Sequence, residues 1–300
     1  MGRLCRMCLA VLIVALAAAG CGKGSTPRSA AGQAPAAPAL TLRVPEGQQV
    51  AYHLVIDTTF NGRSLNGQAL PIDLPLAGKT TLQYDALLRF EQVQENVATV
   101  AYTLSGFDVK TEVGAKPVPV GAPLRGDMRF TVKIDTTTGK PIDADVGPGF
   151  GGILEKDQLM QMLNQSFANL PQGTAVRPGS SWTAEMPLPL DLPGIQGESK
   201  ITVTTKYEAN ETQNGVLVAK LVTTGSGPIS MSGDTGGVAF LLKGSLELSA
   251  TQYIELKTGL QHAMESRTAF TFTQTMKETK SGVSIDTEME SVSKISMTRK

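Results

Sequence analysis

The stretch "DMRFTVKID" at residues 127–135 alternates strictly between polar and apolar side chains. Met128, Phe130, Val132 and Ile134 share one parity, and the residues between them are charged or carry a hydroxyl. Because successive side chains of a β-strand point to opposite faces of a sheet, this pattern predicts a strand with one buried and one solvated face. Such strands are typical of antiparallel sheets.

The same alternation extends over most of the chain. It recurs at 50–60, 82–90 and 100–104, and again in several segments between 198 and 299. Turn dipeptides separate these runs, among them Asn-Gly at 61–62 and 66–67 and Thr-Gly at 138–139 and 258–259. We therefore expect a mainly β fold with about ten to twelve antiparallel strands.

Three landmarks recur at nearly one spacing. "LPIDLP" at 70–75 returns as "LPLDLP" at 188–193, "QENVATVAYTLSG" at 94–106 aligns with "QNGVLVAKLVTTG" at 213–225, and "IDTTTGKPI" at 134–142 aligns with "IELKTGLQH" at 254–262. The offsets of 118, 119 and 120 residues predict an internal duplication, with two related antiparallel β-units. These units would form a curved sheet or half-barrel, or else a sandwich. Proline cannot donate a ladder hydrogen bond, so both hexapeptides, with Asp73 and Asp191, are expected at sheet edges.

Residues 153–170 follow a different period. Leu159, Leu163, Phe167 and Leu170 recur at intervals of four and three residues, and a proline follows at position 171. This spacing predicts one amphipathic helix between the β-units, with its apolar stripe covering the inner face of the sheet. A partner-binding helix is the alternative.

The N-terminus, "MGRLCRMCLAVLIVALAAAGC" at 1–21, has the layout of a secretory signal. Arg3 and Arg6 precede an apolar run at 9–19, which is shorter than the ~20 residues that span a bilayer. Small residues then lead to Cys21, and this end resembles the bacterial lipobox. The resemblance implies cleavage before Cys21 and acylation of its thiol, with palmitate-type chains as the membrane anchor. An ordinary signal peptide cut after Ala19 is the alternative.

Two features of the chain agree with lipidation. Cys5 and Cys8 lie in the segment to be removed, so the mature chain keeps only Cys21, which has no partner for an internal disulfide. Residues 22–39 are small and interrupted by proline, which predicts a flexible tether with a reach of roughly 25 Å. Loss of the signal leaves 25 basic against 27 acidic residues, which argues against nucleic-acid binding.

The expected organisation follows from these observations. A signal peptide occupies 1–20, and the lipidated cysteine and tether occupy 21–39. A first β-unit at 40–150, a helix at 151–172 and a second β-unit at 173–300 complete the chain. We expect an exported lipoprotein of the cell envelope. In a two-membrane bacterium it would lie in the outer membrane facing the periplasm, because Gly22 stands where an aspartate would favour inner-membrane retention.

The stretch "LPQGTAVRPGSSWTAEMPLPL" at 170–190 carries a family resemblance. The helix followed by Ala175, Val176, Gly179 and Trp182 resembles the "P-V-x-x-G-x-x-W" element of DUF6263, a family of uncharacterised bacterial lipoproteins. This resemblance spans about residues 40–300 and implies a fold and a location but no activity. A helix with a curved antiparallel sheet on a lipid anchor is also similar to the LolA/LppX-like half-barrels, which implies binding of lipids or lipidated cargo.

The residues offer little catalytic chemistry. His53 lies on the polar parity of its run and His262 at the edge of the core, and neither has the spacing of a metal site. "DTG" at 234–236 lacks the second carboxylate of an aspartic protease, and "SVSK" at 291–294 lies in a strand pattern, not on a helix. The glycine-rich loop at 143–152 lacks calcium-ligand spacing. We predict no enzyme activity, no catalytic residue, no metal and no cofactor.

Binding is the remaining function. The parity of the strands predicts one apolar face, which either closes on itself as a core or keeps a groove for a ligand. The leading hypothesis is a lipid-anchored, non-catalytic envelope protein that binds a lipid, a lipidated molecule or an envelope partner. The alternative is an assembly scaffold that engages partners through exposed strand edges. The residues expected on the apolar face are Tyr52, Leu54, Leu82, Tyr84, Phe130, Ile134, Ile254, Phe270 and Phe272.

Overall fold

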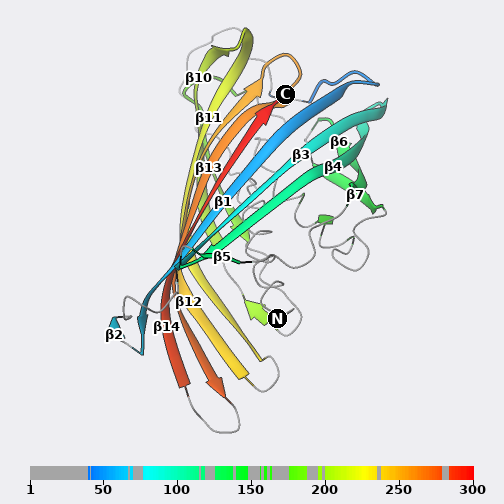
Figure 1. The fold of residues 1–300 in the computed structure, drawn as a ribbon. Helices are drawn as coiled ribbons and strands as arrows, with labels where there is room; N and C mark the ends of the chain where they lie inside the picture. Colours follow the sequence, from blue (N-terminus) through cyan, green and yellow to red (C-terminus); the bar gives the residue numbers. More distant parts are fainter. Residues whose placement is uncertain are drawn as a thin grey trace.

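The computed structural model of the chain is built from antiparallel strands (Figure 1), which confirms the expected mainly β class. Cys21 with its signal and tether, and both proline-containing hexapeptides with Asp73 and Asp191, lie outside the residues that the structure describes. The described residues are 40, 42–66, 68–69, 77–114, 116–118, 126–137, 140–147, 156, 159–160, 163, 176–187, 195–197, 200–234, 238–278 and 284–300.

The described strands form a single sheet of 14 strands, so the sandwich considered from the sequence is wrong. The main order is β7-β6-β4-β3-β1-β14-β13-β12-β11-β10-β8, while the short strands β2, β5 and β9 pair with β1, β4 and β11. The bounds are β1 Gln49–Leu65, β2 Gln68–Ala69, β3 Ala77–Gln94, β4 Val97–Val113, β5 Lys116–Val118, β6 Met128–Asp135, β7 Pro141–Val146, β8 Ser181–Pro187, β9 Ile195–Gly197, β10 Lys200–Gln213, β11 Val216–Asp234, β12 Val238–Glu255, β13 Gln261–Glu278 and β14 Ser284–Arg299.

The first and last long strands meet in the middle of the sheet. β1 pairs antiparallel with β14 from Tyr52 opposite Arg299 to Leu65 opposite Thr287, and the blue and red ribbons run side by side in Figure 1. On either side of this seam, most neighbouring strands are joined by short turns of the chain. The strands of the two expected β-units therefore belong to one continuous sheet.

Burial follows the period-two pattern of the sequence. On β1, Val50, Tyr52, Leu54 and Ile56 are all at most 6% exposed, whereas the side chains between them are only half-buried. We call the face that carries these four residues, with the residues paired to them across the sheet, the inner face. Apolar side chains of this face form three core clusters, which pack residues of β1, β3, β4 and β6 in the first, and of β8, β10, β11 and β12 in the other two.

Glycines on the inner face let neighbouring strands approach closely. A Cβ on Gly244 would lie 2.1 Å from the carbonyl oxygen of Thr271, and one on Gly227 would lie 2.5 Å from that of Lys200. Contacts this short exclude any side chain at the two positions. A glycine within a strand commonly marks such a close backbone approach, and the long strands of this sheet are strongly twisted (Figure 1).

Only four residues of the expected helix at 153–170 are described, so the helix as an element lies outside the described residues and stays a prediction. Two of the four, Leu159 and Leu163, are 3% and 8% exposed and belong to the core cluster of the inner face. A third, Lys156, places its Nζ 2.7 Å from Oδ1 of Asp143. Leu159 and Leu163 thus lie against the inner face of the sheet.

The same turn precedes β1 and β8. Each turn contains a glycine with positive φ, which is 82° for Gly47 and 92° for Gly179. The N–H of Gly47 donates a 2.7 Å hydrogen bond to the carbonyl of Phe90, and the N–H of Gly179 donates one of the same length to the carbonyl of Tyr207. The N–H of each aromatic residue returns a 2.9 Å bond to the residue after the glycine. The "V-x-x-G" element at 176–179 therefore has a counterpart at 44–47 that the sequence comparison did not find.

Two β-bulges also recur at corresponding places. The pairing of β3 with β4 skips Glu91 directly after Phe90, and that of β10 with β11 skips Glu208 directly after Tyr207. In the next hairpins the pairing skips Ile142 on β7 and His262 on β13. The strand orders β7-β6-β4-β3-β1 and β13-β12-β11-β10-β8 thus share this turn and these two bulges, although β3 and β4 have a further register shift between Gln83 and Asp85 that β10 and β11 lack. β14 lies between the two sets.

Candidate functional site

The residues expected on the apolar face all lie on the inner face of the sheet, but the two halves of this face differ in how deeply their side chains are buried. Tyr52, Leu54, Leu82, Tyr84, Phe130 and Ile134 are all at most 8% exposed and lie in one core cluster. Ile254 is buried in another cluster, Phe270 is half-buried against a third, and Phe272 is half-buried. The structure therefore brings six of the nine residues together and places the other three farther along the same face.

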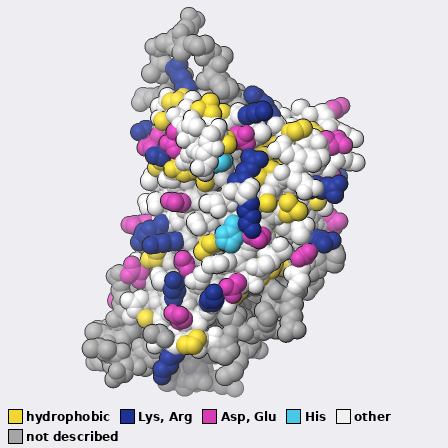
Figure 2. All heavy atoms as spheres, turned by 45° about the horizontal axis from the view of Figure 1, so that its top comes forward, with side chains coloured by type: hydrophobic (Ala, Val, Ile, Leu, Met, Phe, Trp, Pro, Cys, Tyr) yellow, Lys and Arg dark blue, Asp and Glu magenta, His cyan; other side chains and the backbone are white. Residues whose placement is uncertain are grey.

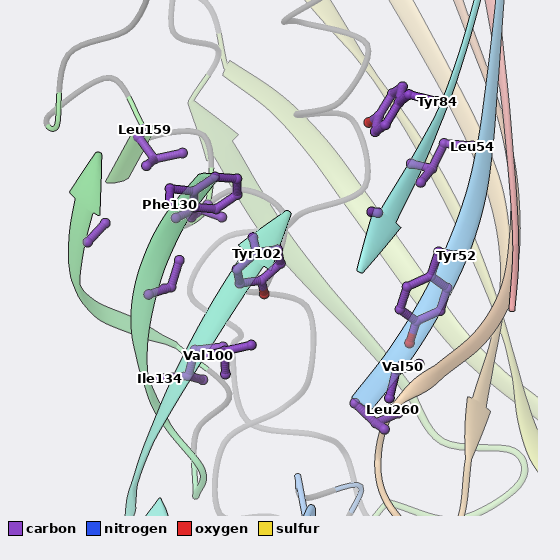
Figure 3. Close-up of a cluster of buried hydrophobic side chains, with 14 of the residues drawn as sticks. Val50, Tyr52, Leu54, Tyr84, Val100, Tyr102, Phe130, Ile134, Leu159 and Leu260 are labelled. Atoms are coloured by element: carbon purple, nitrogen blue, oxygen red, sulfur yellow. The ribbon is translucent and has the colours of Figure 1, made fainter. Parts of the chain in front are cut away.

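The half built on β1, β3, β4 and β6 is a packed core. Figure 3 shows Tyr52, Tyr84, Tyr102 and Phe130 entering one interior from different strands. Tyr102 and Phe130 stack with ring centroids 4.6 Å apart, and burial raises the pKa of Tyr102 above its ordinary value. The Tyr102 hydroxyl is buried and has no hydrogen-bond partner among the described residues. Protein side chains occupy this half of the inner face.

A row of hydroxyl side chains crosses the inner face next to this core. Strand register places Thr111, Thr80, Thr58, Ser293 and Thr268 side by side on five neighbouring strands. We call these five residues the hydroxyl row. Thr58, Ser293 and Thr268 are at most 6% exposed, and the hydroxyl oxygens of Thr58 and Ser293 are 3.1 Å apart. Cross-strand hydroxyl pairs of this kind stabilise a sheet modestly, by roughly 0.2–1 kcal/mol each.

A further hydroxyl group, that of Ser266, lies beside this row. Ser266 lies two residues from Thr268 on β13, opposite Ile295 of β14, and its Oγ is buried without a partner in the described part of the chain. A hydroxyl both donates and accepts hydrogen bonds, and leaving one buried and unpaired costs roughly 1–3 kcal/mol. The middle of the inner face therefore carries buried hydroxyl groups between two apolar regions.

Beyond the hydroxyl row the inner face becomes apolar again but is less covered. Pairing across β11 to β14 places Met231 opposite Leu242, Phe240 opposite Met276, and Phe272 opposite Met289. All six side chains are half-buried, and we call them the distal apolar patch. Methionine is flexible and polarisable, so a patch with three methionines can adapt to ligands of different shape.

A hollow in the described surface lies away from the distal apolar patch. A depression of about 530 Å³ opens to solvent at the ends of β1, β3, β4 and β14. Lys79, Glu112 and Glu290 are among the residues that line it. This mixture of charges does not suit an acyl chain, because ligand sites for apolar molecules are lined mainly by apolar and aromatic side chains.

The outer face of the sheet is polar and of mixed charge. Figure 2 shows acidic and basic side chains interspersed over the face in view. His53 is on this side, as its parity predicts; its Nδ1 lies 2.8 Å from Oδ1 of Asp85, which in turn lies 2.7 Å from Nζ of Lys300. The hydrogen bond from Lys300, followed by that from His53, lowers the pKa of the Asp85 carboxyl.

The sequence patterns that resemble catalytic motifs do not assemble into sites. Ser291 is buried on the inner face and Lys294 is exposed on the outer face, so the two side chains of "SVSK" are separated by the sheet. Asp234 ends β11, and the rest of "DTG" lies outside the described residues. Within the described ranges, no three histidine, cysteine or acidic side chains are close enough to hold a metal ion.

The residues expected on the apolar face leave out the hydroxyl row and most of the packed core. Phe90, Val100, Tyr102 and Val132 share the parity of the predicted residues and could have been added from that pattern alone. The hydroxyl row could not, because its members are scattered over 58–293 and only strand register aligns them. The Nδ1 atom of His262 is buried without a partner in the described chain.

Comparison with known proteins adds no family. No protein-family model matches the chain, and no curated protein matches it. Solved structures with some likeness include a Salmonella typhi OmpF complex with daunomycin, at 7% identity and a TM-score of 0.25, covering 84% of this chain and 98% of that one. An outer-membrane channel from Pseudomonas putida F1 gives 7% identity and a TM-score of 0.20, covering 90% and 100%. At TM-scores this low, the likeness supports no conclusion about the fold or function of this chain.

In the ranges that the structure describes, no helix is both long enough and apolar enough to cross a bilayer.

Proposed function

We propose that this chain is a lipid-anchored, non-catalytic protein of the bacterial cell envelope that binds an amphiphilic ligand with an acyl chain. The binding surface is the inner face of the sheet from the hydroxyl row to the distal apolar patch. The acyl chain lies along the patch, and the polar part of the ligand lies at the hydroxyl row. No metal or cofactor takes part.

The observation that carries this proposal is the half-burial of the distal apolar patch. Six apolar side chains on four neighbouring strands are neither exposed, as on a solvated face, nor sealed, as in the packed core. From Thr268 to Met276 this surface extends over about 27 Å of strand, at 3.4 Å per residue. The hydrocarbon core of a bilayer, two acyl chains thick, is about 30 Å, so one chain fits along the face.

Two adjacent residues of β12 provide a direct test. Leu242 is half-buried on the inner face and Leu241 is 36% exposed on the outer face. We expect Leu242→Glu to weaken binding of a fluorescent fatty-acid probe to the purified protein about tenfold or more, because it places a charge against the acyl chain. Leu241→Glu adds the same charge on the other face and should leave the affinity unchanged.

The unfolding midpoint of both variants in urea separates binding from folding. If neither variant changes the affinity for the probe, or if both lower it equally, the inner face is not the binding surface. If the unmodified protein neither binds the probe nor carries lipid through purification, the proposal of an acyl ligand is wrong.

The anchor is part of the same proposal. It is supported by the signal-like segment, the small residues before Cys21 and the flexible composition of 22–39. Cys21→Ala should abolish incorporation of labelled palmitate and release the protein from the membrane fraction, because a lipid anchor adds about 0.8 kcal/mol of membrane affinity per buried CH₂. A Cys21→Ala chain that still incorporates palmitate would refute lipidation at this residue.

We also propose that the two strand sets arose by internal duplication. Support comes from the shared turn at Gly47 and Gly179, from the bulges after Phe90 and Tyr207, and from the skipped residues Ile142 and His262. Matched bulges carry weight because bulges are retained within families as designed features. In this arrangement the amphipathic helix at 151–172 joins the two copies and covers the inner face near Leu159.

A further inference from the structure

The strand β8 forms one edge of the sheet, and its outward backbone groups can be assigned. The carbonyl of Ser180 accepts a 2.9 Å hydrogen bond from the N–H of Tyr207, so the backbone of residue 180 faces β10. Backbone groups alternate in direction along a strand. Those of Ser181, Thr183 and Glu185 therefore point away from β10, and they have no backbone partner in the described part of the chain.

The corresponding side of β1 is covered. The shared turns match Gly47 with Gly179, and the pairing of Gln49 with Arg89 matches that of Ser181 with Lys206, so Ala51 corresponds to Thr183. The carbonyl of Ala51 accepts a 2.9 Å hydrogen bond from the N–H of Lys300, at the end of β14. Among the described residues, no strand pairs with β8 at the matching position, where β14 pairs with β1.

We propose that the β8 edge binds the β8 edge of a second copy of this chain, antiparallel and centred on Thr183. The two Thr183 residues then exchange a pair of backbone hydrogen bonds, as do Ser181 and Glu185 in each direction, about six bonds in all. This inference does not depend on the proposed ligand.

The side chains of β8 are self-complementary in this register. On the outer face, Glu185 stands opposite Ser181 of the other copy, and threonine stands opposite threonine, so no like charges face each other. On the inner face, the large Trp182 stands opposite the small Ala184, which avoids a clash between two bulky residues. Such reciprocal pairing is what an interface with two-fold symmetry requires.

The pairing also keeps the two inner faces on one side. The two-fold axis of an antiparallel strand pair is perpendicular to the sheet, so both copies present their inner faces in the same direction. Trp182 and Ala184 are 6% and 4% exposed within the core clusters of that face. The dimer therefore continues one apolar face across two chains, with the edge groups of both copies satisfied.

Disulfide trapping in the full-length chain tests this register. Residues 183 of the two copies would have Cα atoms about 5.5 Å apart, within the range that a disulfide bridges. We expect Thr183→Cys to give about tenfold more disulfide-linked dimer under mild oxidation than Thr204→Cys. Thr204 is a matched control, because it lies directly opposite Thr183 on β10 and its substitution removes the same 3.0 Å hydroxyl contact.

Further variants test the register of the two β8 strands and provide controls. Ser181→Cys alone should not link, because the two copies of residue 181 would be offset by four residues, about 14 Å. A mixture of Ser181→Cys and Glu185→Cys chains should link across the pair. The proposal would be overturned if Thr183→Cys formed no more disulfide-linked dimer than Thr204→Cys and the mixture of Ser181→Cys and Glu185→Cys chains formed none. Efficient linking of Ser181→Cys alone would overturn the register, and the unmodified chain measures linking through its own cysteines.

Discussion

At the scale of single residues, the outer face gains a local charge cluster from strands that are distant in sequence. His53 and Asp85 stand directly opposite each other on β1 and β3, and Lys300 reaches the same carboxylate oxygen from the C-terminal end of the chain. The parity of its strand predicts that His53 is solvated, and the structure confirms it. Its partners depend on the register between strands.

The Asp85 cluster predicts a pH dependence of stability. The pKa of Asp85 is lowered by Lys300 and then by His53, so its contribution is fully present above the ordinary pKa of 3.8 and is lost as the pH falls through the lowered folded value. Asp85→Asn should cost on the order of 0.5 kcal/mol at pH 7, typical of exposed ion pairs. Urea unfolding at pH 7 and near pH 2 should show a smaller difference at low pH, and an equal difference would contradict this role.

At the scale of elements, the turns before β1 and β8 depend on backbone conformation. Gly47 and Gly179 have φ values of 82° and 92°, and a Cβ added to either would meet no atom within 4 Å. A side chain is therefore disfavoured only by the positive φ. The glycine of the element at 176–182 is thus explained by a backbone conformation that glycine adopts most readily.

These turns should respond alike to the same substitution. Gly47→Ala and Gly179→Ala should each lower the free energy of unfolding by roughly 1–2 kcal/mol, since an L-residue at positive φ places its Cβ too close to the carbonyl oxygen. Asparagine tolerates positive φ better, so Gly47→Asn and Gly179→Asn should cost less. Urea denaturation of the four variants measures this, and clearly unequal costs at the two turns would argue against their equivalence.

At the scale of the whole molecule, β14 holds the sheet together. It lies between β1 and β13 and so joins the strand set of the first unit to that of the second. Ile295 of β14 is 4% exposed and packs in the core cluster of the first unit, while its strand pairs with β13 of the second. β1, the first long strand, can therefore pair with β14 only once the C-terminal part of the chain is in place.

Weakening β14 should therefore affect both strand sets. Ile295→Ala should lower the free energy of unfolding by about 2–5 kcal/mol through the cavity that it leaves. Amide hydrogen exchange should quicken in β3 and in β12 alike, whereas Ser296→Ala, on the exposed outer face next in sequence, should change neither. Faster exchange confined to one set would show that the two units unfold independently.

Much of the fold follows from local pattern. The antiparallel class, the buried parity and six residues of the packed core could be predicted because alternation along a strand determines which side chains share a face. The choice between a single sheet and a sandwich could not, since both bury the same parity. The hydroxyl row was also beyond prediction: Thr58 and Ser293 each look like an ordinary polar residue of a strand, and only their contact makes them neighbours.

The sequence by itself determined the strands and their two faces, because these depend on spacing over a few residues, and the anchor at Cys21 stays a prediction. Only the tertiary structure decided which strands are neighbours. Thr58 and Ser293 meet across the seam of β1 and β14 although 235 residues separate them. Pairing over such a separation depends on backbone hydrogen bonds and packing across the whole sheet, and no local period records it.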